Sequence, residues 1–334
     1  MFLGSIRRLL PVASRAAVGA AIVMASVGVL GLSSCTGMAS AKGTPVLNAE
    51  DWRSYDGKVM PWRPSEVPEG QPIKAVVVTI HGLSGAALDF WPIGDALPPK
   101  GIAVYGIELR GQGNDPDVKR RGDIRSAKVW QKDLSTFNEL VRRKHPGLPV
   151  IWYAESLGTL IAINTLVDLP PQDRPVGIVC SSPAAGLRLQ PKASQYWLLR
   201  IATTVLPGKK VNLEKLAGVD DRDIRVTHDT THEAQMARTP HYVPEFSLRL
   251  LGQIDRMMRD LPEAARRTTL PVLVMASPND VIASPEQIQS FYDELSSKDK
   301  KLNWYRRSYH LLLHDTERQQ VLADGTHWIE SHLK

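Results

Sequence analysis

Cysteine is scarce in this 334-residue chain, which contains two, and no acidic residue precedes Glu50. Two cysteines exclude a disulfide-rich scaffold, and no Cys/His spacing indicates a metal site. Lysine and arginine do not cluster, so nothing indicates a nucleic-acid partner. No internal repeat or low-complexity tract is apparent. The length suits one large α/β domain or two small ones.

The acid-free N-terminus has the pattern of a secretory signal. Three arginines at positions 7, 8 and 15 precede an apolar run over residues 16–32. A positive segment followed by an apolar one is the signal-peptide pattern. Leu32-Ser33-Ser34-Cys35 follows it and resembles a bacterial lipobox, in which the cysteine is lipidated and becomes the mature N-terminus.

We therefore interpret residues 1–34 as a lipoprotein signal peptide, Cys35 as the lipidated residue and residues 35–48 as a tether. The expected location is that of an exported bacterial lipoprotein, at the periplasmic face of the cell membrane or in the outer membrane. An uncleaved anchor, or an ordinary signal peptide with an incidental cysteine, is the alternative, because the apolar run is near the lower length for spanning. Without the signal segment, 41 basic residues become 38 against 35 acidic ones, a net charge of +3. The second cysteine, Cys180, is expected in the core as a small apolar residue.

Six short apolar runs predict the strands of one sheet. They cover residues 75–80, 102–107, 150–154, 176–180, 271–275 and 302–305. The first and third of these are apolar on both faces, as in a covered parallel sheet. Asp56-Gly57 between two short alternating segments predicts an N-terminal hairpin. Strands alternating with helices predict a mostly parallel, doubly wound α/β sheet.

One amphipathic helix is predicted from about Ser126 to Lys144. Its large apolar residues fall at i, i+4, i+7 and i+11, on one helical face: Trp130, Leu134, Phe137 and Val141. His145-Pro146-Gly147 is expected to end it.

Regular alternation stops after Pro183, and residues 186–266 contain no clear buried strand. We expect this segment to be a helical cap inserted between two parts of the core, residues 49–185 and 267–334. Its apolar residues near 196–206 have two possible roles. They line an acyl channel, or they pack the cap onto the sheet, as apolar helix stripes usually do.

The segment Val150–Gly158 predicts a nucleophile elbow. A buried strand ends at Ser156 between small residues, Ala154 and Gly158, and a helix-compatible run follows. In the G-x-S-x-G elbow a strained turn lifts a serine hydroxyl above the sheet edge. The alternative is a chance Ser-x-Gly at the start of a buried helix.

A serine nucleophile needs a base and a group that orients the base. On this type of sheet the chain order is serine, acid, histidine, with loops meeting at the carboxyl edge. Asp280 follows the strand at 271–275, and His310 follows the strand at 302–305. We expect Asp280 as the orienting acid, although it also suits an ordinary turn, and Asn279 as the weaker candidate. We expect His310 as the base, with His314 as its rival.

The oxyanion donors are expected at the same edge. The strand at 75–80 runs into His81-Gly82-Leu83-Ser84-Gly85, a glycine-rich turn that exposes backbone N–H groups. The expected donors are the N–H of Leu83 and the N–H of Leu157, which follows the nucleophile. His81 is then a support of the loop. The alternative is a simple turn that ends the strand.

With these residues placed, the chain resembles the α/β-hydrolase superfamily, and within it the monoacylglycerol lipase and lysophospholipase group of serine-aminopeptidase-like hydrolases. The segments that carry the resemblance span about residues 50–330: Ser54–Gly57, His81–Leu83, Leu109–Gly113, Glu155–Gly158, Ser181–Ala184, Pro271–Val274 with Asp280, and Tyr309–Leu312. Three positions depart from the group pattern: Ala154, Gln112 and Thr159.

The resemblance implies a serine carboxylester hydrolase that cleaves lipid-like esters of monoacylglycerol or lysophospholipid type through an acyl-enzyme. It implies Ser156 as nucleophile, His310 as base, Asp280 as orienting acid, and no cofactor. Partners are then a lipid-like ester and, through Cys35, a membrane, while the oligomeric state stays open. A peptidase or thioesterase with the same triad, or a lipid-binding lipoprotein without activity, is the alternative.

Overall fold

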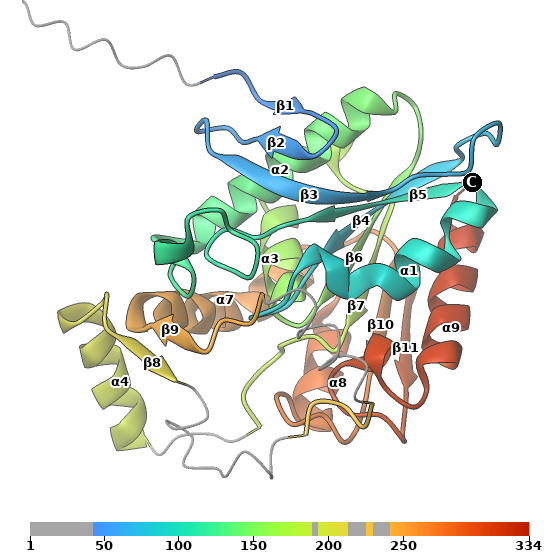
Figure 1. Ribbon diagram of the computed structural model, residues 1–334. Helices are drawn as coiled ribbons and strands as arrows, with labels where there is room; N and C mark the ends of the chain where they lie inside the picture. Colours follow the sequence, from blue (N-terminus) through green and yellow to red (C-terminus); the bar gives the residue numbers. More distant parts are fainter. Residues whose placement is uncertain (1–42, 189–192, 213–224, 230–240, 334) are drawn as a thin grey trace, which may run out of the picture. The chain divides into compact units, whose positions relative to one another are not determined.

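The computed structural model describes residues 43–188, 193–212, 225–229 and 241–333 (Figure 1). The predicted signal peptide, Cys35 and most of the predicted tether lie outside the described residues. Within the described part of the chain, no helix has the length and apolar character needed to cross a membrane.

Within the described residues, nine strands form one sheet in the order β1-β2-β3-β5-β4-β6-β7-β10-β11. From β5 to β11 every neighbouring pair is parallel, and the pairs β1–β2, β2–β3 and β3–β5 are antiparallel. The prediction of a mostly parallel sheet with an N-terminal hairpin is confirmed. The bounds are β1 Val46–Leu47, β2 Asp51–Arg53, β3 Val59–Ser65, β4 Ala75–Ile80, β5 Ile102–Ile107, β6 Val150–Glu155, β7 Gly177–Ser181, β10 Val272–Ala276 and β11 Lys300–Trp304.

Helices cover both faces of this sheet. In Figure 1, α1 and α9 lie on one face, and α2, α3 and α7 lie on the other. The bounds are α1 Trp91–Ala96, α2 Ala127–Lys144, α3 Leu157–Leu166, α7 Leu248–Arg266, α8 Pro285–Glu294 and α9 Arg318–Ser331, with short 3₁₀ turns at η1 Ala87–Phe90, η2 Pro98–Lys100, η3 Val118–Arg120, η4 Pro171–Asp173 and η5 Leu312–His314.

Strand β4 shows why the parallel strands read as continuous apolar runs. All six of its residues are buried. Val76, Val78 and Ile80 belong to the cluster that contains residues of α2, α3 and α7, whereas Ala75 and Val77 belong to the cluster with α1 and α9. Alternate side chains therefore enter two separate cores, and both positions must be apolar.

Helix α2 matches its prediction. Ser126 caps it by accepting a hydrogen bond from the Lys128 N–H, and the helix ends at Lys144. The predicted stripe of Trp130, Leu134, Phe137 and Val141 is fully buried. The predicted turn at Asp56-Gly57 joins β2 and β3 in the hairpin. Gly57 has φ +86° there, a value that glycine adopts readily.

The segment predicted as a cap, residues 186–266, has two different parts among its described residues. Helix α4 (Ala193–Val205) is followed by a two-stranded antiparallel sheet of β8 (Lys210–Asn212) and β9 (Glu245–Ser247). Phe246 and Ser247 of β9 are buried, so the expectation of no buried strand was wrong for this short element. Helix α7 packs against α3, with Leu250, Met257 and Leu261 in the main core.

Five large apolar side chains in α4 and at the residue after it are exposed to solvent. Trp197 is 60% exposed and Val205 is 67% exposed, and the same holds to a similar degree for Leu198, Ile201 and Leu206. Helix α4 contacts α7 through other residues, such as Tyr196, whose hydroxyl donates to Asp255 at 3.2 Å. Of the two roles left open for this stripe, packing onto the sheet is therefore wrong for these five side chains.

Candidate active site

Ser156 lies in a sharp turn between β6 and α3. Its backbone has φ +53° and ψ −116°, a conformation that side chains rarely adopt and that costs on the order of 1–3 kcal/mol. A Cβ placed on Gly158 would lie 2.1 Å from the carbonyl oxygen of Ile80, so only glycine fits there. Ala154, on the other side of the turn, is fully buried in β6 and has room for its methyl group. The local sequence thus builds the strained turn that the elbow pattern predicts.

The structure brings the predicted acid and base together. Asp280 follows β10, His310 follows β11, and the imidazole Nδ1 lies 2.8 Å from Oδ2 of Asp280. Asp280 is fully buried and His310 is 5% exposed. The other carboxylate oxygen, Oδ1, accepts the backbone N–H of Ile282 at 2.7 Å, which fixes the carboxylate.

Burial lowers the pKa of His310, but the charge and hydrogen bond of Asp280, together with the charge of Glu155, raise it above its ordinary value. The positive form of the imidazole is therefore stabilised where a general base would need it.

The two rival residues are placed elsewhere. Nε2 of His314 lies 2.7 Å from the carbonyl oxygen of Asp89, beside η1. The side chain of Asn279 donates to the carbonyl of Arg306 at 2.7 Å. Both side chains therefore bond to backbone carbonyls outside the Asp280–His310 pair.

The loops of Ser156 and His310 meet at the end of β7. The Ser156 N–H donates to the carbonyl of Ser181 at 3.0 Å. The next residue, Ser182, donates its hydroxyl to the carbonyl of His310 at 2.5 Å and is fully buried. Ser182 also has positive φ, +43°, so the strand end itself is bent to reach the histidine loop. Sequence analysis did not assign this role to Ser182, although the segment Ser181–Ala184 carried part of the resemblance.

The predicted oxyanion donors, the N–H groups of Leu83 and Leu157, lie in two segments that adjoin Ser156. Leu157 is the first residue of α3, where a backbone N–H has no partner inside the helix. No acceptor among the described residues bonds the N–H of Leu83 or Leu157. A Cβ on Gly82 would lie 3.3 Å from Cβ of Ser156, so the loop that contains Leu83 touches the serine.

His81 supports this loop, as expected. It is fully buried. Its Nε2 accepts the N–H of Leu109 at 3.0 Å, which leaves Nδ1 to carry the proton and donate to the carbonyl of Gly82 at 2.9 Å. With both ring nitrogens bonded to the backbone, His81 is not free to act as a base.

Glu155 is a buried carboxyl group next to the serine that sequence analysis did not single out. Burial raises its pKa to about 7, against the opposing charges of His310 and His81 and with the added repulsion of Asp89 and Asp280. The signal that could have found it is a charged residue at the last position of a fully buried strand. A buried carboxyl group with a raised pKa next to the proposed nucleophile is a candidate for an electrostatic role in the site.

Replacing Glu155 with glutamine is expected to move the acid limb of the kcat/KM profile to lower pH. The carboxylate stabilises the imidazolium of His310, so its removal lowers the pKa of His310 and extends activity to lower pH. The measurement is kcat/KM for a soluble ester across pH 5–9. An unchanged or higher midpoint would contradict the interaction, and the melting temperature serves as the control for folding.

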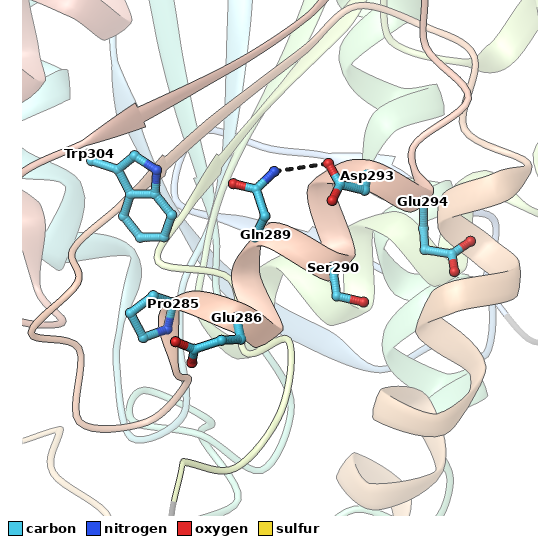
Figure 2. Close-up of a pocket in the computed structure, with 7 residues that line it drawn as sticks. All are labelled: Pro285, Glu286, Gln289, Ser290, Asp293, Glu294 and Trp304. Carbon is cyan, nitrogen blue, oxygen red and sulfur yellow. Dashed lines mark hydrogen bonds between the residues drawn. The ribbon is translucent and has the colours of Figure 1, made fainter.

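A surface depression of about 640 Å³ lies elsewhere, against the outer side of α8 (Figure 2). It is open to solvent and is lined by Pro285, Glu286, Gln289, Ser290, Asp293, Glu294 and Trp304. Gln289 donates to Asp293 across one turn of α8 at 2.8 Å. None of the predicted site residues lines it, so it is not where the site chemistry gathers.

Comparison with known proteins agrees with this geometry. Residues 71–317 match the family described as serine aminopeptidase, S33. The chain is 25% identical over 273 residues to a monoacylglycerol lipase of Mycolicibacterium smegmatis, covering 81% of this chain and 92% of the relative. It is 23% identical over 259 residues to the human monoglyceride lipase, covering 75% and 78%.

Solved structures share the fold. A soluble variant of monoglyceride lipase from Saccharomyces cerevisiae, in complex with a substrate analogue, superposes with a TM-score of 0.72 at 22% identity, covering 88% of this chain and 98% of that one. A monoacylglycerol lipase of Paleococcus ferrophilus superposes with a TM-score of 0.69 at 23% identity, covering 82% and 100%. The chain is thus a serine hydrolase with the α/β-hydrolase fold, and it belongs to the serine aminopeptidase, S33, family.

Proposed function

We propose that this protein hydrolyses lipid-like carboxylesters of the monoacylglycerol type, with Ser156 as nucleophile, His310 as general base and Asp280 as its orienting partner. The observation that carries the proposal is the strained serine that follows β6, at the sheet edge where a buried Asp280 holds His310 at 2.8 Å. The relatives named monoacylglycerol lipase support the substrate class.

The geometry supports hydrolysis in two steps. The hydroxyl of Ser156 attacks the acyl carbon while Nε2 of His310 takes its proton, and Asp280 holds the Nδ1–H and stabilises the resulting imidazolium. The N–H groups of Leu83 and Leu157 donate to the oxygen that becomes negative. His310 then returns the proton to the leaving alcohol, which leaves an acyl group on Ser156. A water molecule, activated in the same way, cleaves this acyl-enzyme to the fatty acid and free serine.

Two alternatives belong to other classes. A peptidase or thioesterase would use the same residues, and the family description includes aminopeptidases. A lipid-binding protein without activity would not need the strained turn at Ser156 or the buried Asp280–His310 pair, so these features count against it.

A substrate panel separates these functions. Purified protein is assayed with monoacylglycerols, lysophospholipids, acyl thioesters and aminoacyl amides, with Ser156→Ala as the blank for each. We expect kcat/KM to be highest for the monoacylglycerols. Higher values for amides or thioesters would reassign the reaction, and no trapping by a fluorophosphonate probe would favour the lipid-binding function.

The exposed face of α4 supports a substrate that is met at a lipid surface. Trp197, Leu198, Ile201, Val205 and Leu206 leave a contiguous run of large apolar side chains in water, which is costly unless something covers them. Basic residues lie beside them: the Arg200 guanidinium sits 5.1 Å from the Trp197 ring centroid, and Lys209 and Lys210 follow the helix. Aromatic and apolar side chains flanked by basic groups suit an anionic lipid interface.

We also propose that the mature chain is an exported lipoprotein, attached through Cys35. The motif Leu32–Cys35 after an apolar run supports this. Cys35→Ser is expected to release the protein from the membrane fraction or to block its processing, because it removes the residue that carries the lipid. The wild-type protein should resist a high-salt wash, because doubly acylated anchors hold far better than single ones. Fractionation with a high-salt wash, followed by immunoblotting, is the measurement. A wild-type protein found wholly in the soluble fraction would contradict the lipid anchor.

A further inference from the structure

The loop of the proposed oxyanion donor is bonded to a distant segment of the chain. Ser84 accepts the backbone N–H of Val243 at 2.8 Å through its hydroxyl, and the same hydroxyl donates to the carbonyl of Val243 at 3.1 Å. The two residues are 159 positions apart. Val243 lies in the segment predicted as the cap, residues 186–266, just before β9. One side chain thus pairs with both polar groups of a residue in the insertion, much as one strand residue pairs with another.

The backbone of Ser84 is held as firmly as its side chain. Its N–H donates to Oε1 of Gln112 at 2.9 Å, and Gln112 is fully buried. Its φ of +61° is the left-handed conformation, which disfavours a side chain. Non-glycine residues keep such a conformation only where surrounding bonds determine it. The bonds to Gln112 and Val243 do so here, and the N–H of Leu83 belongs to the peptide immediately before.

A third contact presses the insertion against the same loop. A Cβ on Gly113 would lie 2.6 Å from Cβ of His241 and 2.9 Å from the carbonyl oxygen of Gly85, so the three backbones are in close contact. His241 is fully buried, with Nε2 3.3 Å from Oδ1 of Asp89. The other oxygen of Asp89 accepts the N–H of Ala86 at 2.7 Å, at the far end of the loop.

The two other catalytic loops also bond to this insertion. Arg188 donates its side chain to the carbonyl of Asp280 at 2.5 Å and its backbone N–H to Ile282 at 2.6 Å. Leu311, next to His310, donates its N–H to Val226 at 2.9 Å. At three separate points, therefore, the insertion forms hydrogen bonds with a loop that carries a proposed catalytic group.

We propose that Ser84 and Gln112 are positioning residues that hold the Leu83 N–H at the oxyanion position, and that residues 241–243 make this position depend on the insertion. The inference rests on the proposed function, because it assumes that Leu83 donates to an oxyanion. Oxyanion donors act only over a narrow range of distances, and misplacement by about 1 Å costs on the order of 100-fold in rate. The insertion then helps to position a group that stabilises the oxyanion.

The test removes the Ser84 hydroxyl in two ways. Ser84→Ala deletes both bonds to Val243 and keeps the backbone preference, whereas Ser84→Gly deletes the bonds and also accepts the positive φ without strain. Gln112→Met removes the acceptor of the Ser84 N–H with little change of volume. Ser135→Ala is the matched control, since it removes a serine bond to a backbone carbonyl at 2.8 Å within α2, away from the site.

For all three variants at Ser84 and Gln112 we expect kcat on a short soluble ester to fall about tenfold or more, with KM within twofold of the parent. The affinity for a trifluoromethyl ketone, whose hydrate-like adduct with serine places an oxyanion in the site, should fall by the same factor as kcat/KM. A role in folding alone would lower the melting temperature. It would leave the ratio of ketone affinity to substrate affinity, measured through KM, unchanged. Ser135→Ala should match the parent in all kinetic values.

Three results would overturn the inference. The first is unchanged kcat in Ser84→Ala. The second is a kcat of Ser84→Gly equal to that of the parent while Ser84→Ala is slow, which would assign the effect to backbone strain. The third is loss of ester hydrolysis without loss of affinity for the ketone. Failure of the proposed function is recognised separately, because Ser156→Ala would then keep its activity, whereas failure of the inference alone leaves Ser156→Ala inactive.

Discussion

Ser156→Ala is expected to lower kcat on a soluble ester by about 10⁴-fold or more, since removal of a serine nucleophile takes away a whole catalytic unit. The fold should persist, because no side-chain hydrogen bond of Ser156 to another described residue supports the elbow, and its backbone bonds to Ser181 and Thr159 do not involve the side chain. The measurements are kcat, fluorophosphonate labelling and the melting temperature. Activity within tenfold of the parent would refute the assignment.

Ser156→Gly provides a matched comparison for the same site. It is expected to be as inactive as the alanine variant but to melt at a higher temperature, because glycine adopts φ +53° without the steric cost that alanine bears. The difference in unfolding free energy should be about 1 kcal/mol, reduced by the greater freedom of glycine in the unfolded chain. Equal melting temperatures would show that the elbow stores no strain.

His310→Ala is expected to be nearly as damaging as Ser156→Ala, whereas His314→Ala should keep activity within about tenfold. The reason is geometric: the imidazole of His310 is hydrogen-bonded to the carboxylate of Asp280, whereas the imidazole of His314 is hydrogen-bonded to the backbone carbonyl of Asp89. Loss of that second bond should cost about 1 kcal/mol of stability and little rate. Measurement of kcat/KM and thermal unfolding for both variants decides between them, and the reverse ranking would move the base to His314.

The double variant Ser156→Ala/His310→Ala tests whether the two residues act as one unit. Residues of one catalytic unit show losses that do not add, so the double variant should be little worse than either single variant. If the fold-decrease in rate of the double variant equalled the product of the two single fold-decreases, the histidine would act in a separate step. Asp280→Asn is a further comparison, because it keeps the shape of the partner and removes the charge.

The centre of the sheet was predictable because β4, β5, β6, β7 and β10 are buried on both faces and are therefore apolar at nearly every position. The predicted strand at 150–154 became β6 with one residue added, and the edge at which parallel strands end placed Ser156, Asp280 and His310 in neighbouring loops. The fold and the chain order together predicted that Asp280 and His310 lie close to each other, and the hydrogen bond between them agrees with this.

Other features had no signal in the sequence. The pairing of Ser84 with Val243 depends on two backbones 159 residues apart, and neither residue belongs to a periodic segment. The apolar stripe of α4 has the same spacing as a packed helix, and only the fold reveals that its side chains face water. Strands β8 and β9 have three residues each, too few to show alternation.

The tie of Ser84 to Val243, together with the contacts of Arg188 and Val226, has a consequence for recombination between relatives. An exchange of residues 186–266 for the corresponding segment of another hydrolase would leave Ser84 and Gly113 facing a foreign backbone. The unit that can be transplanted intact is therefore discontinuous in sequence: it includes the insertion and short stretches from four core loops, at Ser84, Gly113, Asp280 and Leu311. A chimera joined at the two ends of the insertion would inherit a new entrance and a misaligned site.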